Sequence, residues 1–250
     1  MEVHAHSHTA RKKWTHYLWE FLMLFLAVFC GFLAENQREH IVEHKWELKY
    51  AASLYDDLKK DTSDLSSDIP FWEMMLSRMD TIRQEIEKPR EKRDIFLLYR
   101  NTAHMRAYDN FEYHDRTIEQ LKNGGNFRLI KRSAISDSII DYDANIKSEL
   151  RDQEVQSNNI YQTVNYSLDK IFNSKYFRAI IKNVALPDSL FNPIADVFKV
   201  PVSNEPDLFL YANHLQFYST LTLFRLNSNK RILRRAKNLI ELLKREYHLK

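Results

Sequence analysis

An apolar run near the N-terminus constrains this chain more than any other feature of its sequence. From Tyr17 to Ala34 the chain reads YLWEFLMLFLAVFCGFLA, eighteen residues in which Glu20 is the one charged side chain. As an α-helix the run would be roughly 27 Å long, close to the about 30 Å of a bilayer core. Each face of this helix would be apolar, whereas a surface helix of a globular domain keeps a polar stripe. We therefore expect residues 17–34 to form a transmembrane helix.

The flanks of the run indicate how it lies in a membrane. Trp14, Tyr17 and Trp19 cluster at one end, where aromatic side chains meet the membrane–water interface. Basic residues flank both ends in nearly equal number: Arg11 to Lys13 precede the run, and Arg38, Lys45 and Lys49 follow it among glutamates. The compact cluster at 11–13 with the free amino terminus favours a cytoplasmic N-terminus. We expect a cytoplasmic tail at 1–16 and a domain at 35–250 on the opposite side of the membrane.

A cleaved signal peptide is the alternative interpretation of the run. Cleavage after Ala34 would place Phe32 three residues from the end of the run, where a signal peptidase requires a small side chain. The sequence therefore favours a retained anchor.

Scarce glycine and cysteine restrict the fold of the remaining chain. Three glycines occur, Gly31, Gly124 and Gly125, whereas tight hairpins and phosphate-binding loops need residues that adopt positive φ. The single cysteine, Cys30, lies inside the apolar run, so residues 35–250 can form neither an internal disulfide nor a thiolate zinc site. The net charge of +3 is small for a nucleic-acid-binding protein. These features favour an all-α fold without a nucleic-acid partner.

Apolar residues recur at helical spacing beyond the run. The pattern at 41–58 predicts that the anchor continues into a stalk helix, with a first stop at Ser66–Pro70 and a second helix ending before Pro89. A segment at 94–123 with a break near 108–111 should end at the two glycines. A long helix should then begin at Ser133.

The last part of the chain contains a proline-rich linker and one more helix. Pro187, Pro193, Pro201 and Pro206 predict the linker. The final helix should span 207–247, with a start signal at 204–207 in which Pro206 takes an early helical position. We expect a transmembrane helix that continues into an elongated antiparallel helical bundle.

Three stretches of the sequence resemble an uncharacterised Bacteroidota family of single-span membrane proteins, a domain of unknown function. They are WTHYLWEFLMLFLAVFCGFLAEN at 14–36 with its HxHxH lead-in, LKNGGNFRLI at 121–130 and LKREYHLK at 243–250. The resemblance covers most of the chain in order. It implies a Gram-negative inner membrane and a periplasmic domain, and it implies no activity, ligand or catalytic residue.

Histidines form two candidate metal sites. His4, His6 and His8 alternate, so an extended tail could present three imidazoles to Zn²⁺, Cu²⁺ or Ni²⁺; the alternative is a disordered tail. His40 and His44 lie one helical turn apart beside Glu43 and Glu47, without a third defined ligand. A solvated helix face explains this second group.

Two further clusters suggest chemistry that the sequence supports weakly. The break in the 94–123 segment gathers His104, Tyr108, Asp109, His114 and Asp115, which could serve acid–base catalysis, but no nucleophile motif accompanies them. Aspartates at 56, 57, 61, 64 and 68 suggest calcium, yet the glycine of an EF-hand loop is missing. We expect these aspartates to form the exposed side of the stalk.

Residues 122–132 combine Gly124 and Gly125 with Arg128. This combination could expose backbone N–H groups to an anion, or it could simply end one helix and start another.

The expected function is that of a membrane-anchored periplasmic interaction or accessory protein of the cell envelope, without catalytic activity and without a cofactor. Its partners would be the lipid bilayer and other envelope proteins, including further copies of itself. The alternative is a periplasmic ligand-sensing bundle that signals through a separate partner, because the short tail at 1–16 leaves no room for an output domain.

Overall fold

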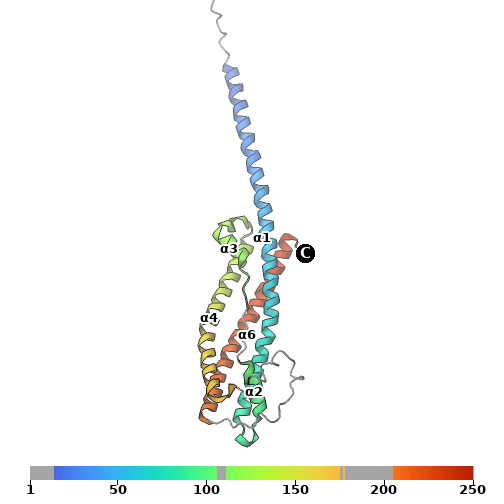
Figure 1. Ribbon diagram of the computed structural model, residues 1–250. Helices are drawn as coiled ribbons and strands as arrows, with labels where there is room; N and C mark the ends of the chain where they lie inside the picture. Colours follow the sequence, from blue (N-terminus) through green and yellow to red (C-terminus); the bar gives the residue numbers. More distant parts are fainter. Residues whose placement is uncertain (1–13, 106–110, 175–176, 178–204, 250) are drawn as a thin grey trace, which may run out of the picture. The chain divides into compact units, whose positions relative to one another are not determined.

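A computed structural model describes residues 14–105, 111–174, 177 and 205–249 (Figure 1). All regular elements in these ranges are helices, which confirms the all-α prediction. They are α1 (Trp14–Glu87), η1 (Arg90–Lys92), α2 (Ile95–His104), α3 (Arg116–Asn123), η2 (Asn126–Leu129), α4 (Ser133–Ile171) and α6 (Glu205–Tyr247). The chain divides into two compact units, Met1–Tyr50 and Ala51–Lys250.

The first unit contains the N-terminal part of α1. Among the described residues, α1 is the one helix long and apolar enough to cross a membrane, and no part of that span is buried within the protein. Phe21, Phe25 and Phe29 stack along one side of the helix, with successive ring centroids 6.3 and 5.9 Å apart. This surface is suited to lipid and costly in water.

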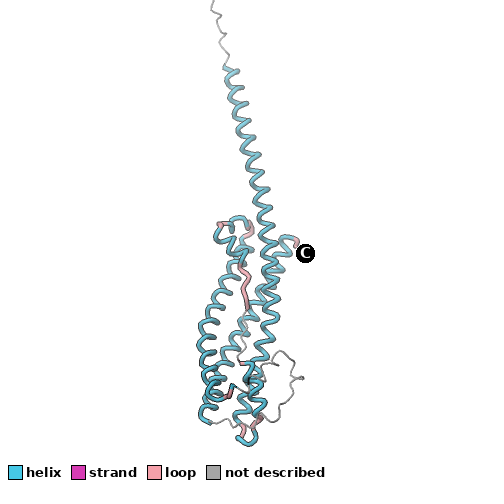
Figure 2. Tube along the Cα trace, in the orientation of Figure 1, coloured by secondary structure: helices cyan, strands magenta, loops and turns pink. Residues whose placement is uncertain are grey.

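The second unit is an antiparallel bundle of three long helices: α1 from Ala51 onward, α4 and α6 (Figures 1 and 2). Contacts between α6 and the other two run in opposite order along the chain. On α4, Glu149 contacts Ser228 of α6 and Ser167 contacts His214. On α1, Asp68 contacts Asn229 of α6 and Met79 contacts Ser219. Hence α6 is antiparallel to both α1 and α4, and the chain between α1 and α4 returns through α2, the segment 111–115 and α3.

The bundle core consists of large apolar side chains at helical spacing. A continuous cluster joins the four helices α1, α2, α4 and α6. Its members include Trp72, Met75, Met79, Ile82, Ile86, Leu98, Tyr99, Val164, Leu168, Leu208, Tyr211 and Leu215. Because these side chains come from distant parts of the sequence, burying them stabilises the tertiary fold rather than single helices.

The predicted stop at Ser66–Pro70 is wrong, because α1 continues through Pro70 to Glu87. Proline removes one backbone donor and disfavours a helix interior. Both Ser66 and Pro70 are exposed, so the carbonyl that loses its partner can bind water. Leu65 and Trp72 are buried on either side, and their packing holds the helix in one piece.

Other boundaries follow the sequence closely. The long helix begins at Ser133 as predicted, and α6 begins two residues before the predicted start, with Pro206 as its second residue. Residues 111–115 are not helical, so α3 begins at Arg116, later than the predicted break at 108–111 implies. Positions 187, 193 and 201 of the proline-rich linker lie outside the described residues.

Candidate functional site

The predicted membrane-interface residues lie at the start of α1. Trp14, Tyr17 and Trp19 are all exposed, as is the free thiol of Cys30 farther along the same helix. Exposed tryptophan and tyrosine at the end of an apolar helix have the amphipathic character of interfacial anchors.

Among the described residues, the structure does not assemble a metal site from the predicted histidines. His4, His6 and His8 lie outside the described residues. His40 approaches Glu43 at 4.0 Å and His44 approaches Glu47 at 3.4 Å, each one turn along α1. Within the described ranges, no group of three or more His, Cys, Asp or Glu side chains is arranged to hold a metal ion.

The two glycines form a turn after α3. The Gly124 N–H donates to the Gln120 carbonyl at 3.2 Å, and Gly125 adopts a left-handed φ of 61°. Arg128 follows in η2 and already interacts with other groups of the protein. This geometry closes α3 and turns the chain toward α4, and the anion remains a prediction.

The prediction that the α1 aspartates form an exposed stalk face is wrong for three of them. Asp57, Asp61 and Asp68 are 2%, 1% and 3% exposed, whereas Asp56 is exposed and Asp64 partly so. The buried carboxylates face other segments of the bundle, whose donors replace the lost water. Helical spacing could reveal only Trp72, which donates to Asp68 at 3.0 Å from one turn along α1, because the other donors lie far away in sequence.

Asp61 fastens the segment before α3 to the bundle. The backbone N–H of His114 donates to Asp61 Oδ1 at 2.9 Å, and His114 Nδ1 lies 3.0 Å from the same oxygen. The buried Tyr142 hydroxyl of α4 donates to Asp61 Oδ2 at 2.8 Å. Burial raises the pKa of the Asp61 carboxyl, and the bonds from His114 and Tyr142 offset part of that rise.

Two further buried carboxylates, Asp57 on α1 and Asp143 on α4, bind the same part of the chain. Asp57 accepts the backbone N–H of Thr117 at 3.1 Å and also binds the Thr117 hydroxyl, which fixes the first turn of α3. Asp143 of α4 binds the Tyr113 hydroxyl at 2.9 Å together with two lysines, Lys122 and Lys147. Burial opposes ionisation of Asp143, but these three donors outweigh it and lower its pKa.

The polar cluster of Asp57, Asp61 and Asp143 holds chain segments in position. Each of these carboxylates is already bonded to the donors named above. His114 reaches Asp61 and Asp115 reaches Lys147, whereas His104 at the end of α2 lies 3.0 Å from the Arg100 carbonyl through Nδ1. The described members of the predicted catalytic group therefore face different partners. Tyr108 and Asp109 lie outside the described residues.

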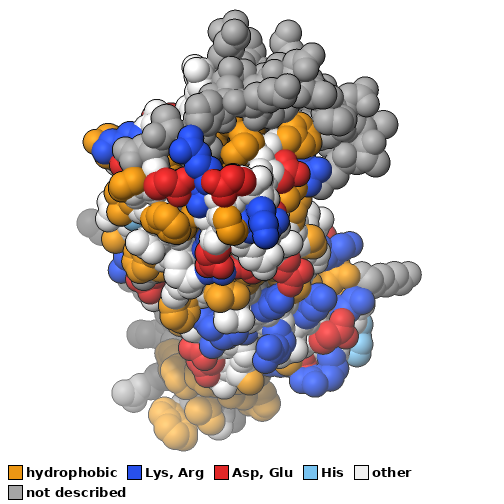
Figure 3. All heavy atoms as spheres, turned by 90° about the horizontal axis from the view of Figure 1, so that it is seen from below, with side chains coloured by type: hydrophobic (Ala, Val, Ile, Leu, Met, Phe, Trp, Pro, Cys, Tyr) orange, Lys and Arg blue, Asp and Glu red, His pale blue; other side chains and the backbone are white. Residues whose placement is uncertain are grey.

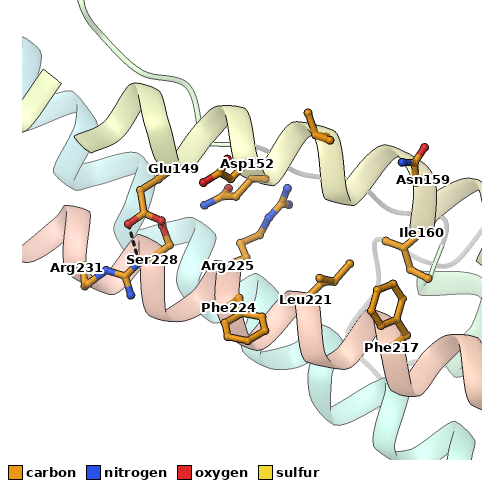
Figure 4. A pocket seen from close by; sticks show the side chains of 12 residues that line it. Glu149, Asp152, Asn159, Ile160, Phe217, Leu221, Phe224, Arg225, Ser228 and Arg231 are labelled. Carbon is orange, nitrogen blue, oxygen red and sulfur yellow. Dashed lines mark hydrogen bonds and ion pairs between the residues drawn. The ribbon is translucent and has the colours of Figure 1, made fainter. Parts of the chain in front are cut away.

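A groove between α4 and α6 is the better candidate for a binding site (Figure 4). Its volume is about 670 Å³, within the range of ligand and side-chain pockets. Ile160 and Val155 of α4 and Phe217, Leu221 and Phe224 of α6 form its apolar lining.

The polar end of the groove is fixed by bonds between helices. Glu149 of α4 accepts from Arg231 at 2.6 Å and binds the Ser228 hydroxyl, both from α6 (Figure 4). Burial opposes ionisation of Glu149, and these two bonds lower its pKa. The Arg225 guanidinium lies 4.3 Å from the ring centroid of Trp72 on α1.

The apolar wall of the groove continues onto the outer face of α6. Five large apolar side chains are exposed there: Phe209 (48%), Leu210 (44%), Phe217 (57%), Leu223 (51%) and Phe224 (63%). We call these five residues the α6 stripe. Helical periodicity did not predict this stripe, although one signal was present in the sequence: residues 208–224 contain no Asp, Glu, Lys or Arg.

Fold and surface together define an all-α domain that follows a membrane-length helix and exposes an apolar stripe beside a groove. No protein-family model, curated protein or solved structure matches the chain.

Proposed function

We propose that this protein is a membrane-anchored interaction or accessory protein of the cell envelope, and that its helical domain acts by binding proteins rather than by catalysis. The observation that carries the proposal is the α6 stripe. Soluble surfaces rarely expose large contiguous apolar patches, and those that do use them for binding. The apolar span at the start of α1 would hold that surface close to a bilayer.

The proposed location is the inner membrane, with one span, the tail 1–16 in the cytoplasm and the domain in the periplasm. Arg11 to Lys13 support the orientation, because basic flanks remain cytoplasmic. The resemblance to single-span Bacteroidota proteins supports the compartment. A reporter fused after Lys250 should be active only in the periplasm, and activity in the cytoplasm would overturn this topology.

Rescue of a deletion strain tests the role of the stripe. The double variant Phe217→Glu/Phe224→Glu places two charges on the stripe, at positions exposed enough for the fold to persist. Lys237→Glu changes the charge of an exposed residue on the same helix and serves as the matched control. Expressed at equal level, the control should restore any envelope phenotype of the deletion, and the double variant should not. Full rescue by the double variant would contradict the proposal.

A ligand-sensing bundle is the second candidate, favoured by the groove itself. Its volume of about 670 Å³ and its apolar lining with a polar end suit a small amphipathic molecule. Native mass spectrometry of the full chain, released from membranes in mild detergent, would reveal a bound small molecule. Leu221→Trp should then displace it by filling the groove, and an unchanged ligand occupancy would contradict the sensor.

A further inference from the structure

The exposed side chains of α6 change character abruptly along the helix. From 209 to 227 none of the exposed residues is charged: Phe209, Leu210, Asn213, Gln216, Phe217, Leu223, Phe224 and Asn227. From 230 to 245 all but one are charged: Lys230, Arg231, Arg234, Arg235, Lys237, Asn238, Glu241 and Arg245. The second half has the composition of a solvated helix, and the first half does not.

The stripe is also regular. Leu210, Phe217 and Phe224 recur every seven residues, so they lie almost in line along the helix, and Phe209 and Leu223 widen the line on one side. A seven-residue apolar repeat on an exposed face is the pattern by which one helix packs against another. Figure 3 shows the bundle from below, where acidic, basic and apolar side chains are interspersed.

We propose that the α6 stripe is covered by the same stripe of a second copy of this chain, which makes the protein a homodimer. This inference rests on the proposed function, because it names the first partner of the proposed binding surface.

The polar residues of the face favour a second copy over a different partner. Asn213, Gln216 and Asn227 carry amides, which both donate and accept hydrogen bonds. An amide can therefore pair with its own copy across a two-fold axis, whereas a carboxylate or an ammonium group would repel its copy. A face intended for a different protein commonly uses charge to select that partner, and this one has none.

The area of the stripe is sufficient for a pair. With about half of each side chain exposed, and about 150–250 Å² per large side chain, the stripe offers roughly 500 Å² of apolar surface. Two stripes would bury about 1,000 Å² before any polar neighbour is counted, near the lower bound for a specific interface. Anchors in one bilayer would confine both copies and raise their effective concentration.

The geometry of the stripe gives a residue-level expectation. Phe217 lies midway between Leu210 and Phe224, so a two-fold contact brings it close to Phe217 of the second copy whether the helices run parallel or antiparallel. The contact should end before Arg231 in a parallel pair, because identical residues from there on would bring like charges together.

Cysteine cross-linking of the full chain in its membrane tests the pairing without introducing a charged residue into the stripe. In a Cys30→Ser background, Phe217→Cys should form a dimer band with a short bismaleimide. Lys237→Cys should not, because residue 237 lies about 30 Å farther along α6 than residue 217, beyond the end of the stripe at Phe224. An adduct of Phe217→Cys with a different polypeptide, or no adduct, would overturn the pairing.

Molar mass in detergent or nanodiscs provides the second measurement. The wild-type chain should have twice the 30.0 kDa of one copy. Phe217→Glu/Phe224→Glu should raise the dissociation constant at least about 100-fold, since the dimer would bury unpaired carboxylates. Lys237→Glu should leave it unchanged, and circular dichroism should show equal helix content in all three proteins. A wild-type monomer, or a double variant that dimerises like wild type, would overturn the pairing.

The pairing and the proposed function can fail separately. If the wild-type chain is monomeric but the double glutamate variant fails to rescue the deletion strain, the pairing is wrong and the interaction function stands. If the double variant is monomeric and rescues fully, while the wild type is dimeric, the pairing stands and the function of the stripe is wrong.

Discussion

Replacement of Asp61 should separate the role of its shape and hydrogen bonds from that of its charge. Asp61 is 1% exposed, and its two oxygens accept from the His114 backbone, the His114 ring and the Tyr142 hydroxyl. In Asp61→Ala the buried Tyr142 hydroxyl and the His114 N–H lose their acceptor, at about 1–3 kcal/mol for each unsatisfied group. Removing a desolvated carboxylate returns part of this cost, since burial raises the pKa of Asp61. We expect a net loss of about 2–4 kcal/mol in the free energy of unfolding.

Asp61→Asn should be much milder. Both His114 contacts go to Oδ1, which an asparagine retains, and the Tyr142 hydroxyl can accept a bond from the new Nδ2. We therefore expect a change below about 1 kcal/mol. The assay is guanidinium unfolding of the full chain in mild detergent, followed by far-ultraviolet circular dichroism.

The comparison of the two variants can refute the reasoning. An Asp61→Ala protein as stable as wild type would mean that the buried carboxylate costs as much as its bonds contribute. An Asp61→Asn protein as unstable as Asp61→Ala would mean that the negative charge itself, through His114, holds the segment before α3. Tyr142→Phe isolates one bond and should cost about 1.5–3 kcal/mol, as expected for a bond to a charged acceptor.

Three further predictions concern pH, the turn and the proline. The pKa of Asp143 in the folded protein lies below its usual value of 3.8, so its ionised carboxylate stabilises the fold above pH 3.8. This stabilisation is lost as the pH falls through the folded pKa. Asp143→Asn should therefore make the free energy of unfolding depend less on pH in this acidic range. Gly125→Ala should cost about 1 kcal/mol in the same unfolding assay, because alanine is strained at a φ of 61°. Pro70→Ala should stabilise the protein by about 1–3 kcal/mol by restoring a helical N–H on the exposed side of α1, and a lower midpoint of thermal unfolding would contradict this.

The sequence by itself determined the features that depend on neighbouring residues. The apolar span, the start of α4 at Ser133, the turn at Gly124 and Gly125 and the end of α6 at Tyr247 follow from local composition, glycine φ freedom and helical period. Local interactions of this kind are present wherever the segment is placed, so a single sequence is enough to predict them.

Only the tertiary structure decided which polar residues are buried and which apolar ones are exposed. Asn229, 161 residues away, donates to Asp68, and Tyr142, 81 residues away, donates to Asp61. A neighbouring residue, Trp72, also donates to Asp68 at 3.0 Å, but local sequence alone places neither aspartate in the core. Likewise, α6 is apolar both on the face that packs into the bundle and on the stripe, so periodicity could not show which side stays exposed. Helix α1 continues through Pro70 for the same reason, because packing on both sides of the proline outweighs a local preference to stop.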